Sequence, residues 1–375
     1  MTSAPEPTLH RVVAHAGGPR EIGLGPDHPT LDGLPQLALA VEGGTVRTGE
    51  WIPGSVHRGA EKLFESRDYR QILMLVDRHD WLSAFCSEIG VAVGVERALG
   101  LAPPPRAQDI RVLLCELTRI AHHLAFLAPL PGDLPDPWRA SAWAWREQVL
   151  DLVEAATGHR VHPMFCQVGG VRSDVPDAWV DTVRIAAEGW SVEALDAEPL
   201  RRVLDSAYAG VAVLSGSDAR ALGASGPVAR ASGVDLDLRR DDPYLPYPDL
   251  VVPLSTAGDA RARVRLLVEE IGVSIGVVRW AAGALAGSSG ESVAVRLPRV
   301  VRVPEGATYT WTENPTGING YLLVSRNDRT PWRLKVRSAG FGNAAALGRA
   351  LAGTRVEDLP AAIASFLLVC GDVDR

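Results

Sequence analysis

Cysteine is scarce in this sequence, and none of it is arranged to bind a metal cluster. The four cysteines, Cys86, Cys115, Cys166 and Cys370, are scattered, and no two form a Cys-x-x-Cys pair. Iron–sulfur ligation and thioredoxin-type redox chemistry both depend on closely spaced cysteines. The sequence therefore predicts neither site in this chain, and it favours a reduced, cytosolic protein over a secreted, disulfide-linked one.

Three other features are also missing. Basic residues number 38 against 45 acidic ones, no tract of five or more basic residues occurs, and nucleic acid is therefore not expected as a partner. The first twenty residues lack the basic, apolar and small regions of a signal peptide. The nearest approach to a membrane span, Val273 to Gly287, is interrupted by Arg279 and Trp280 and falls short of roughly 20 apolar residues. Any membrane location is expected to come through partner proteins.

What the sequence does contain is extensive helical periodicity. Apolar residues make up 46 % of the 375 residues, enough for a substantial core. Apolar positions at helical spacing predict helices over 69–99, ending at Gly100, over 106–127, and over about 138–157, ending at Gly158. Further helices are expected near 177–205, near 259–285 and in the last forty residues.

Strand signals are confined to two stretches. Apolar and polar residues alternate around Gly43 and Gly44, which predicts a hairpin. Residues 292–337 are rich in Val, Leu, Tyr and Trp, with a turn at "NDRTP". We therefore expect an α+β fold: a mainly helical bundle with a small β-rich lobe from about 23–60 and 290–340, preceded by a flexible lead-in over 1–22.

The loop "GLGPDHPTLDG", Gly23 to Gly33, is the first candidate for chemistry. Three glycines, two prolines, two aspartates and one histidine fill its eleven positions. His28 lies between two prolines, which restrain its backbone. A restrained histidine suits hydrogen bonding, metal binding or proton relay. The alternative is a turn whose histidine only fastens the loop to its neighbour.

Two further stretches concentrate ionisable residues. "VDRHDW" places Asp77, Arg78, His79 and Asp80 within an apolar helical pattern, and buried charges are costly unless they are paired. This helix therefore either crosses solvent or lines a polar site. "HRGAEKL" is typical of a helix start that presents Arg58 to a buried partner, or of a solvated helix terminus.

Two more stretches are better explained by structure than by chemistry. Glu116, Arg119 and His123 share one helix face, while adjacent His122 and His123 point about 100° apart and cannot chelate one ion together. "GASGPVARASG" lacks a phosphate-binding signature, so a tight chain reversal against another backbone is expected. No serine-nucleophile or kinase signature occurs.

Taken together, the order of these stretches resembles one family. "GPDHPTLDG", "HRGAEKL", "DRHDW", "ERALG", "RAQDIRVLLCELTRIAHHL", "LDLVEAATGHRVHPMF", "GGVRSDVPDAW", "GASGPVARASG" and the terminal "GDVDR" follow the order found in the D subunits of bacterial NADH-quinone oxidoreductase, respiratory complex I. That family is similar to the large subunit of nickel–iron hydrogenases. The resemblance covers about residues 23–375, and it is specific because so many short motifs share their order.

The resemblance implies a hydrogenase-large-subunit-like bundle and a role in a proton-translocating oxidoreductase. Such a subunit lies in the peripheral arm, on the cytoplasmic side of the cell membrane, against the subunit with the terminal iron–sulfur cluster and above the membrane sector. Together the two subunits form a quinone head-group cavity. The implied substrate is a quinone, with menaquinone expected. Electrons come from NADH through the FMN and iron–sulfur clusters of other subunits, and this chain binds no cofactor. The missing cysteine pairs also exclude a hydrogenase nickel site.

The chain departs from the family at the positions that matter most. A family histidine that contacts the quinone is Asp32 here, and a family tyrosine is Trp81. The aspartate that partners that histidine matches Asp133 in "GDLPD", and a family glutamate falls at Ile318.

The resemblance thus implies a catalytic role for Asp32 and Asp133, substrate contacts from His28, Asp32, Trp81 and Asp133, and structural polar roles for Arg58, Asp77 and Arg78. If the two aspartates lie together, like charge would raise one pKa and let Asp32 donate a proton. Two alternatives stay open: a non-catalytic scaffold, or a subunit of a related membrane-bound redox complex with a different electron partner.

Overall fold

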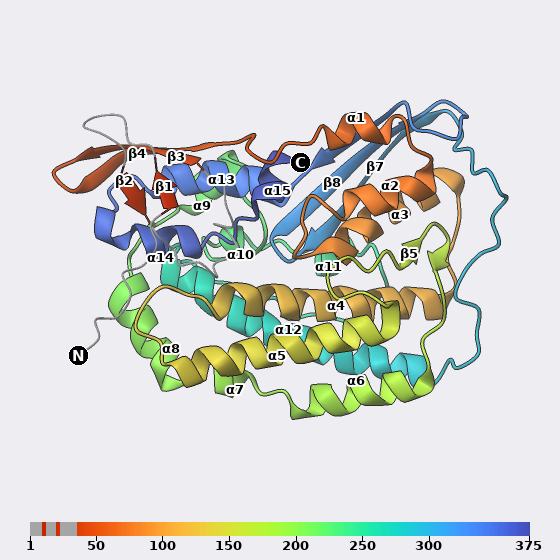
Figure 1. The fold of residues 1–375 in the computed structure, drawn as a ribbon, viewed down its shortest axis with the longest axis horizontal. Coiled ribbons are helices and arrows are strands. Elements are labelled where there is room, and N and C mark those ends of the chain that lie inside the picture. Colours follow the sequence, from red (N-terminus) through yellow and green to blue (C-terminus); the bar gives the residue numbers. More distant parts are fainter. Residues whose placement is uncertain (1–9, 13–19, 23–35) are drawn as a thin grey trace.

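A layer of long helices forms the larger part of the protein. The computed structural model describes residues 10–12, 20–22 and 36–375. Four helices run lengthwise beside one another in the lower half of Figure 1: α4 (Pro105–Leu127), α5 (Asp136–Thr157), α6 (Asp177–Gly189) and α12 (Ala260–Ala286). α4 packs on both α5 and α12, and α12 also packs on α6. The predicted mainly helical α+β fold is confirmed.

The ends of these helices follow from local sequence. Proline at the first position of α4 and at the second of α5 removes a backbone N–H that no helical carbonyl would accept. Gly100 and Gly158 end α3 (Ala84–Leu99) and α5 with φ of 64° and 83°, a left-handed conformation that glycine adopts without strain. Both predicted glycine caps are therefore confirmed.

Two antiparallel sheets lie on the opposite side of the molecule from α5 and α6 (Figure 1). β3 (Gln36–Glu42) pairs with β4 (Thr45–Ile52), and both turn residues, Gly43 and Gly44, have positive φ, as a type I′ hairpin requires. β7 (Gly306–Asn314), β8 (Gly317–Ser325) and β9 (Arg333–Arg337) form a three-stranded sheet in that order.

The strands expected to share one lobe thus belong to two separate sheets. α13 (Ala339–Ala350) packs on both β4 and β8 and so connects the hairpin to the three-stranded sheet. Two more hairpins are small. β5 (Cys166–Gln167) pairs with β6 (Gly170–Val171). β1 (His10–Val12) pairs with β2 (Arg20–Ile22), inside the segment that the sequence predicts to be a flexible lead-in.

The remaining helices are shorter and fill the connections. They are α1 (Ala60–Phe64), α2 (Tyr69–Val76), α7 (Val192–Leu195), α8 (Glu198–Val203), the π-helix η2 (Leu204–Tyr208), α9 (Gly216–Ala221), α10 (Gly226–Arg230), α11 (Leu238–Asp241), the 3₁₀-helix η3 (Val356–Asp358), α14 (Leu359–Ala364) and α15 (Cys370–Asp374). α15 lies between the two sheets, beside α13 (Figure 1).

The segment 69–99 departs from its expected single helix. α2 ends at Val76, α3 begins at Ala84, and residues 77–83 between them form turns. The ring of His79 bonds the carbonyl of Val76, a group that a continuing helix would need, and so closes the end of α2. The "VDRHDW" stretch therefore lies on a buried connection rather than inside a helix.

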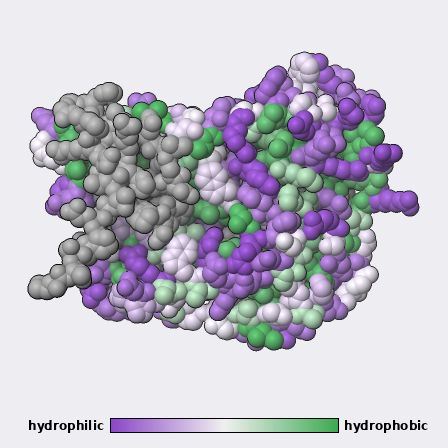
Figure 2. Space-filling view, viewed as in Figure 1, coloured by the Kyte–Doolittle hydropathy of each residue, from purple (hydrophilic) through white to green (hydrophobic). Residues whose placement is uncertain are grey.

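The surface is mixed in character. Hydrophilic residues spread over most of the face seen in Figure 2, with apolar residues in small groups between them. Among the described helices, none has the length and apolar character to cross a membrane.

Candidate functional site

The sequence-predicted residues fall into three places. Trp81, Arg58 and Arg78 line one cavity, and Asp77 is buried beside it. Asp133 is exposed in the connection between α4 and α5 and does not line this cavity. His28 and Asp32 lie outside the described residues, so their proposed pairing with Asp133 stays a prediction.

The cavity has a volume of about 280 Å³ and is built from four separate stretches of chain. Its lining residues are Val56, Arg58, Ala60, Arg78, His79, Trp81, His162, Gly371 and Arg375. Trp81 also borders a second, much smaller cavity, of about 30 Å³, so its indole ring separates the two. We call the larger one the Trp81 cavity.

Asp77 organises one side of the Trp81 cavity. Its fully buried carboxylate accepts a hydrogen bond from Arg78 and lies 3.4 Å from Nδ1 of His162. Both partners are partly exposed, and both line the cavity. The buried anion therefore orients a guanidinium and an imidazole toward the cavity, in agreement with the structural role predicted for Asp77 and Arg78.

His162 is also positioned by a buried carboxyl group on α3. Glu88 accepts hydrogen bonds from the backbone N–H groups of Met164, Phe165 and Cys166, at 2.8, 3.1 and 2.9 Å. Burial raises the pKa of Glu88 to about 8 despite these three donors. The segment that carries His162 is thereby fixed to α3.

Behind His79 lies a pair of buried acids. Burial lowers the pKa of His79 to about 4, so the ring is neutral at pH 7, and its Nε2 lies 3.6 Å from Oδ1 of Asp372. Burial raises the pKa of Asp80 to about 6, although Ser83 and Thr316 donate hydrogen bonds to it. Burial and the nearby Asp80 charge raise the pKa of Asp372 well above its usual range. These acids can hold protons close to neutral pH.

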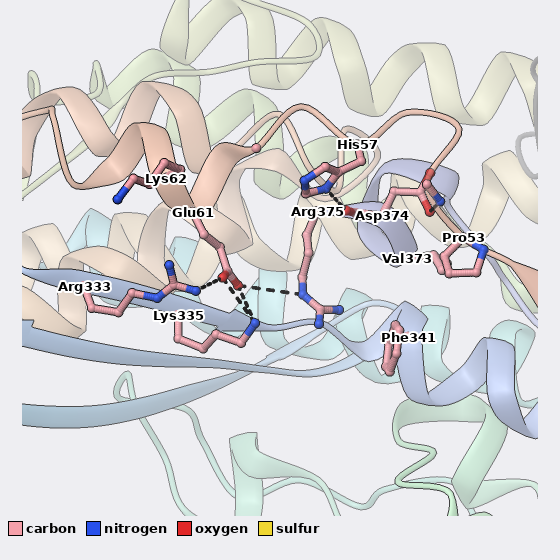
Figure 3. A pocket seen from close by; sticks show the side chains of 12 residues that line it. Pro53, His57, Glu61, Lys62, Arg333, Lys335, Phe341, Val373, Asp374 and Arg375 are labelled. Atoms are coloured by element: carbon pink, nitrogen blue, oxygen red, sulfur yellow. Dashed lines mark hydrogen bonds and ion pairs between the residues drawn. The ribbon is translucent and has the colours of Figure 1, made fainter.

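A more open groove of about 450 Å³ adjoins the Trp81 cavity through Arg375 (Figure 3). Inside it, Glu61 contacts Arg333 at 2.5 Å, Lys335 at 3.0 Å and Arg375 at 3.8 Å. The Arg375 guanidinium lies 4.7 Å from the centre of the Phe341 ring. Glu61 lies in α1, which begins directly after the "HRG" of "HRGAEKL". The predicted helix start is confirmed, and Arg58 on it is exposed rather than buried.

Sequence reasoning missed the part that residues 371–375 play in this site. The terminal "GDVDR" matters only as part of the resemblance at sequence level, yet Gly371 and Arg375 line the cavity. Asp374 accepts hydrogen bonds at 2.8 Å from the backbone N–H groups of both Gly54 and Val56. One sequence signal was available, because two aspartates in an otherwise buried terminal segment require partners.

A second cluster of charges lies deep between α4, α12 and the three-stranded sheet. We call it the deep ion-pair network; its members, all fully buried, are Glu116, Arg119, Arg230, Asp237, Arg239, Glu270 and Glu313.

Arg230 is the centre of this network. It contacts Glu270 at 2.6 Å, Glu313 at 2.7 Å and Asp237 at 3.3 Å. His123 contacts Glu270 at 3.1 Å, from the helix face predicted for it.

The glycine-rich stretch that carries Arg230 makes the expected close backbone contact. A side chain at Gly226 would lie 2.6 Å from the backbone of Gly317, so the predicted tight reversal is confirmed. Ile318, next in β8, is buried, and its N–H donates to Ser225 at 3.0 Å. Nowhere in the described part of the chain do three or more His, Cys, Asp or Glu side chains form a possible metal site.

Comparison with known proteins gives one consistent result. The profile of the family described as "Respiratory-chain NADH dehydrogenase, 49 Kd subunit" matches residues 139–298 and 293–375. The second of the NADH-quinone oxidoreductase D subunits of Salinispora arenicola is 45 % identical over 362 residues, which cover 94 % of this chain and 93 % of that protein. The first of the corresponding D subunits of Streptomyces coelicolor is 43 % identical, with both chains covered in full. The corresponding protein of Clostridium beijerinckii is 33 % identical, with 94 % and 96 % covered.

Proposed function

Because the chain belongs to the family of the 49 kDa subunit of respiratory-chain NADH dehydrogenase, we propose that it works as the D subunit of an NADH-quinone oxidoreductase. In this role it forms part of the quinone head-group cavity of a proton-translocating complex. Partner subunits supply NADH oxidation, FMN and iron–sulfur clusters, and the reaction in this chain is the reduction of quinone, with menaquinone as the expected form.

One observation carries the proposal. Two of the motifs behind the family resemblance, "HRGAEKL" and "DRHDW", converge with residues 371–375 on a single cavity. Its volume of about 280 Å³ is close to the lower end of the range for small-molecule sites, about 300–1,000 Å³. The bicyclic or monocyclic head group of a quinone is a ligand of that size class.

The charges around the cavity suit the reaction. Reduction of a quinone to a quinol takes two electrons and two protons, and negative charge builds up on its oxygens until the protons arrive. Arg58, Arg78 and Arg375 border the cavity and would stabilise that charge. Trp81 can donate one hydrogen bond from its indole N–H but cannot transfer that proton. Proton delivery therefore has to come from elsewhere.

Two sources of protons are proposed. One is the pair of Asp32 and Asp133, in which like charge would keep one carboxyl protonated. The other is Asp80 and Asp372, which burial keeps protonated near neutral pH behind His79. The second source is specific to the described geometry, because it lies directly behind a residue that lines the cavity.

We further propose that the chain is a peripheral membrane protein on the cytoplasmic side. It would be held there by the other peripheral-arm subunits, especially the one with the terminal iron–sulfur cluster, and by the membrane sector. The exposed cations Arg58 and Lys62 lie beside the two cavities and would face those partners.

A second candidate is a scaffold that keeps the architecture without the chemistry. Trp81 favours it, because an indole replaces the ionisable hydroxyl of the family's tyrosine. A related redox complex with a different electron partner is the third candidate.

The test is to isolate the tagged chain gently from its native membranes, with its partners, and to measure NADH-dependent reduction of a menaquinone analogue. The native chain is compared with Asp32→His and Trp81→Tyr. Turnover by the native chain supports the proposal. Turnover that is absent in the native complex and gained in either variant would identify a scaffold, while turnover with another electron donor alone would identify a related complex.

A further inference from the structure

We propose that Gly371 sets the width of the Trp81 cavity by letting the Trp81 indole lie against α15, and so limits the size of the quinone head group that can bind. The inference rests on the proposed function, since it names the residue that tunes the same cavity. Gly371 touches no reacting atom in this role; it is a positioning residue that acts through Trp81.

The contact leaves no room for a side chain. A methyl group placed on Gly371 would lie 2.9 Å from Cε3 of Trp81, and closer still to Cζ3 of that ring and to the carbonyl oxygen of His79. Such distances are far inside van der Waals contact. The backbone itself would accept alanine, because Gly371 is helical, without a positive φ, and alanine is the better helix former. Space alone therefore requires glycine here.

α15 cannot move back to relieve the contact. Asp372 accepts a hydrogen bond from the N–H of Gly340 at 2.6 Å, and Asp374 holds Gly54 and Val56. The guanidinium of Arg375 packs on the Phe341 ring (Figure 3). Each neighbour of Gly371 is thus fixed to a different element, so the strain of a larger residue falls on Trp81.

The indole has only one direction in which to move. On its far side lies the small cavity of about 30 Å³, bordered by Phe85, Ala121 and Leu150, which cannot accept a displaced ring. On its near side lies the Trp81 cavity, with about 280 Å³. A side chain at position 371 would therefore push the indole into the Trp81 cavity and narrow it.

A narrower cavity penalises a large ligand more than a small one. A naphthoquinone head group has two fused rings, and a benzoquinone head group has one. Gly371→Ala should therefore raise KM for a short-chain naphthoquinone by about tenfold or more, and raise KM for a short-chain benzoquinone much less. Because the reacting groups are unchanged, kcat should change less than KM does.

The experiment uses the assembled complex with three matched variants. Gly371→Ala is compared with Gly276→Ala, a helical glycine of α12 with no atom near its added methyl group, which should leave both KM values unchanged. The double variant Trp81→Phe/Gly371→Ala removes Cζ3 and Cε3 of the indole. It should recover part of the naphthoquinone KM relative to the sum of the two single effects.

The outcomes separate this inference from the function on which it rests. If the native complex reduces quinone but Gly371→Ala raises both KM values equally, or the double variant shows simple additivity, the inference is wrong and the function stands.

A second readout does not need activity. In the full chain labelled with 5-fluorotryptophan, the Trp81 signal, assigned by its loss in Trp81→Phe, should shift in Gly371→Ala and stay in place in Gly276→Ala. An unmoved signal would overturn the inference even if the complex proved inactive.

Discussion

The Trp81 cavity and the deep ion-pair network show two ways of burying charge. In the network, three arginines face four carboxylates, and each arginine contacts at least one of them directly. Burial alone would raise the pKa of Glu270, yet Arg230 and His123 lower it to about 2. Behind the cavity, Asp80 accepts a hydrogen bond from the Ser83 hydroxyl and Asp372 from a backbone N–H, and burial raises the pKa of both.

The difference assigns the two regions different roles. Carboxylates held by arginines stay ionised over the whole physiological range and act as fixed cross-links between elements. Carboxyls that burial keeps protonated can release and take up protons near neutral pH. Glu313 bridges these behaviours: burial and Asp237 raise its pKa to about 7, although it contacts Arg230. With Glu313 protonated, the three arginines of the network balance the three remaining carboxylates.

The largest expected effect comes from breaking the network at its centre. Arg230→Met should lower the free energy of unfolding by about 3–5 kcal/mol, because Glu270, Asp237 and Glu313 would keep buried charge without a partner. Urea unfolding of the full chain measures this loss. Arg184→Met on exposed α6, which loses only surface ion pairs, should change stability by less than about 1 kcal/mol. Equal losses in the two variants would show that the network does not fix the fold.

The next effect tests the proton-holding region through pH. The folded-state pKa of Asp80 is raised to about 6, so its contribution to stability is present at low pH and lost as pH rises through 6. Asp80→Asn removes this dependence. Relative to the native chain, the variant should therefore gain about 2 kcal/mol between pH 4.5 and pH 7.

Unfolding curves at the two pH values check this result. Asp181→Asn, an exposed change on α6, serves as the control and should show no such gain. A constant difference between Asp80→Asn and the native chain at both pH values would mean that Asp80 is ionised in the folded protein.

The smallest effect concerns the attachment of the cavity's outer loop. Asp374→Ala removes the acceptor of two backbone hydrogen bonds from Gly54 and Val56 and should cost about 1–2 kcal/mol. The loop should then be cleaved faster by trypsin after Arg58, which is exposed already in the native chain. Limited proteolysis followed by mass spectrometry measures that rate. Cleavage at the native rate would show that other contacts hold the loop.

Local sequence predicts the fold where structure depends on near neighbours. The helix over 106–127 corresponds to α4, the hairpin turns at Gly43 and Gly44, and Gly100 and Gly158 end their helices as predicted. The break between α2 and α3 could not be predicted, because residues 77–83 contain neither glycine nor proline. Its cause is a side chain, His79, that bonds the carbonyl at the end of α2.

The site is predictable only where a motif carries it. The resemblance identifies Arg58, Asp77, Arg78 and Trp81 as site residues, and three of the four line one cavity. It could not show that Gly371 lies against Trp81, since 290 positions separate them and no periodicity links them. The partners of Arg230 likewise come from three distant segments, so their pairing depends on how the layers pack.

The length and anchoring of α12 have a mechanical consequence. At 1.5 Å per residue, its 27 residues span about 40 Å, and it is clamped along that length rather than at its ends. Glu270 and Ser274, near its middle, reach Arg230 and Glu116 at 2.6 and 2.7 Å, while Arg263 and Arg279 bind backbone carbonyls toward either end. Sliding or tilting this rod against α4 would have to break several buried bonds at once. Any displacement during turnover is therefore borne by the turns at 53–59 and 77–83, and the helical layer moves as a stiff block.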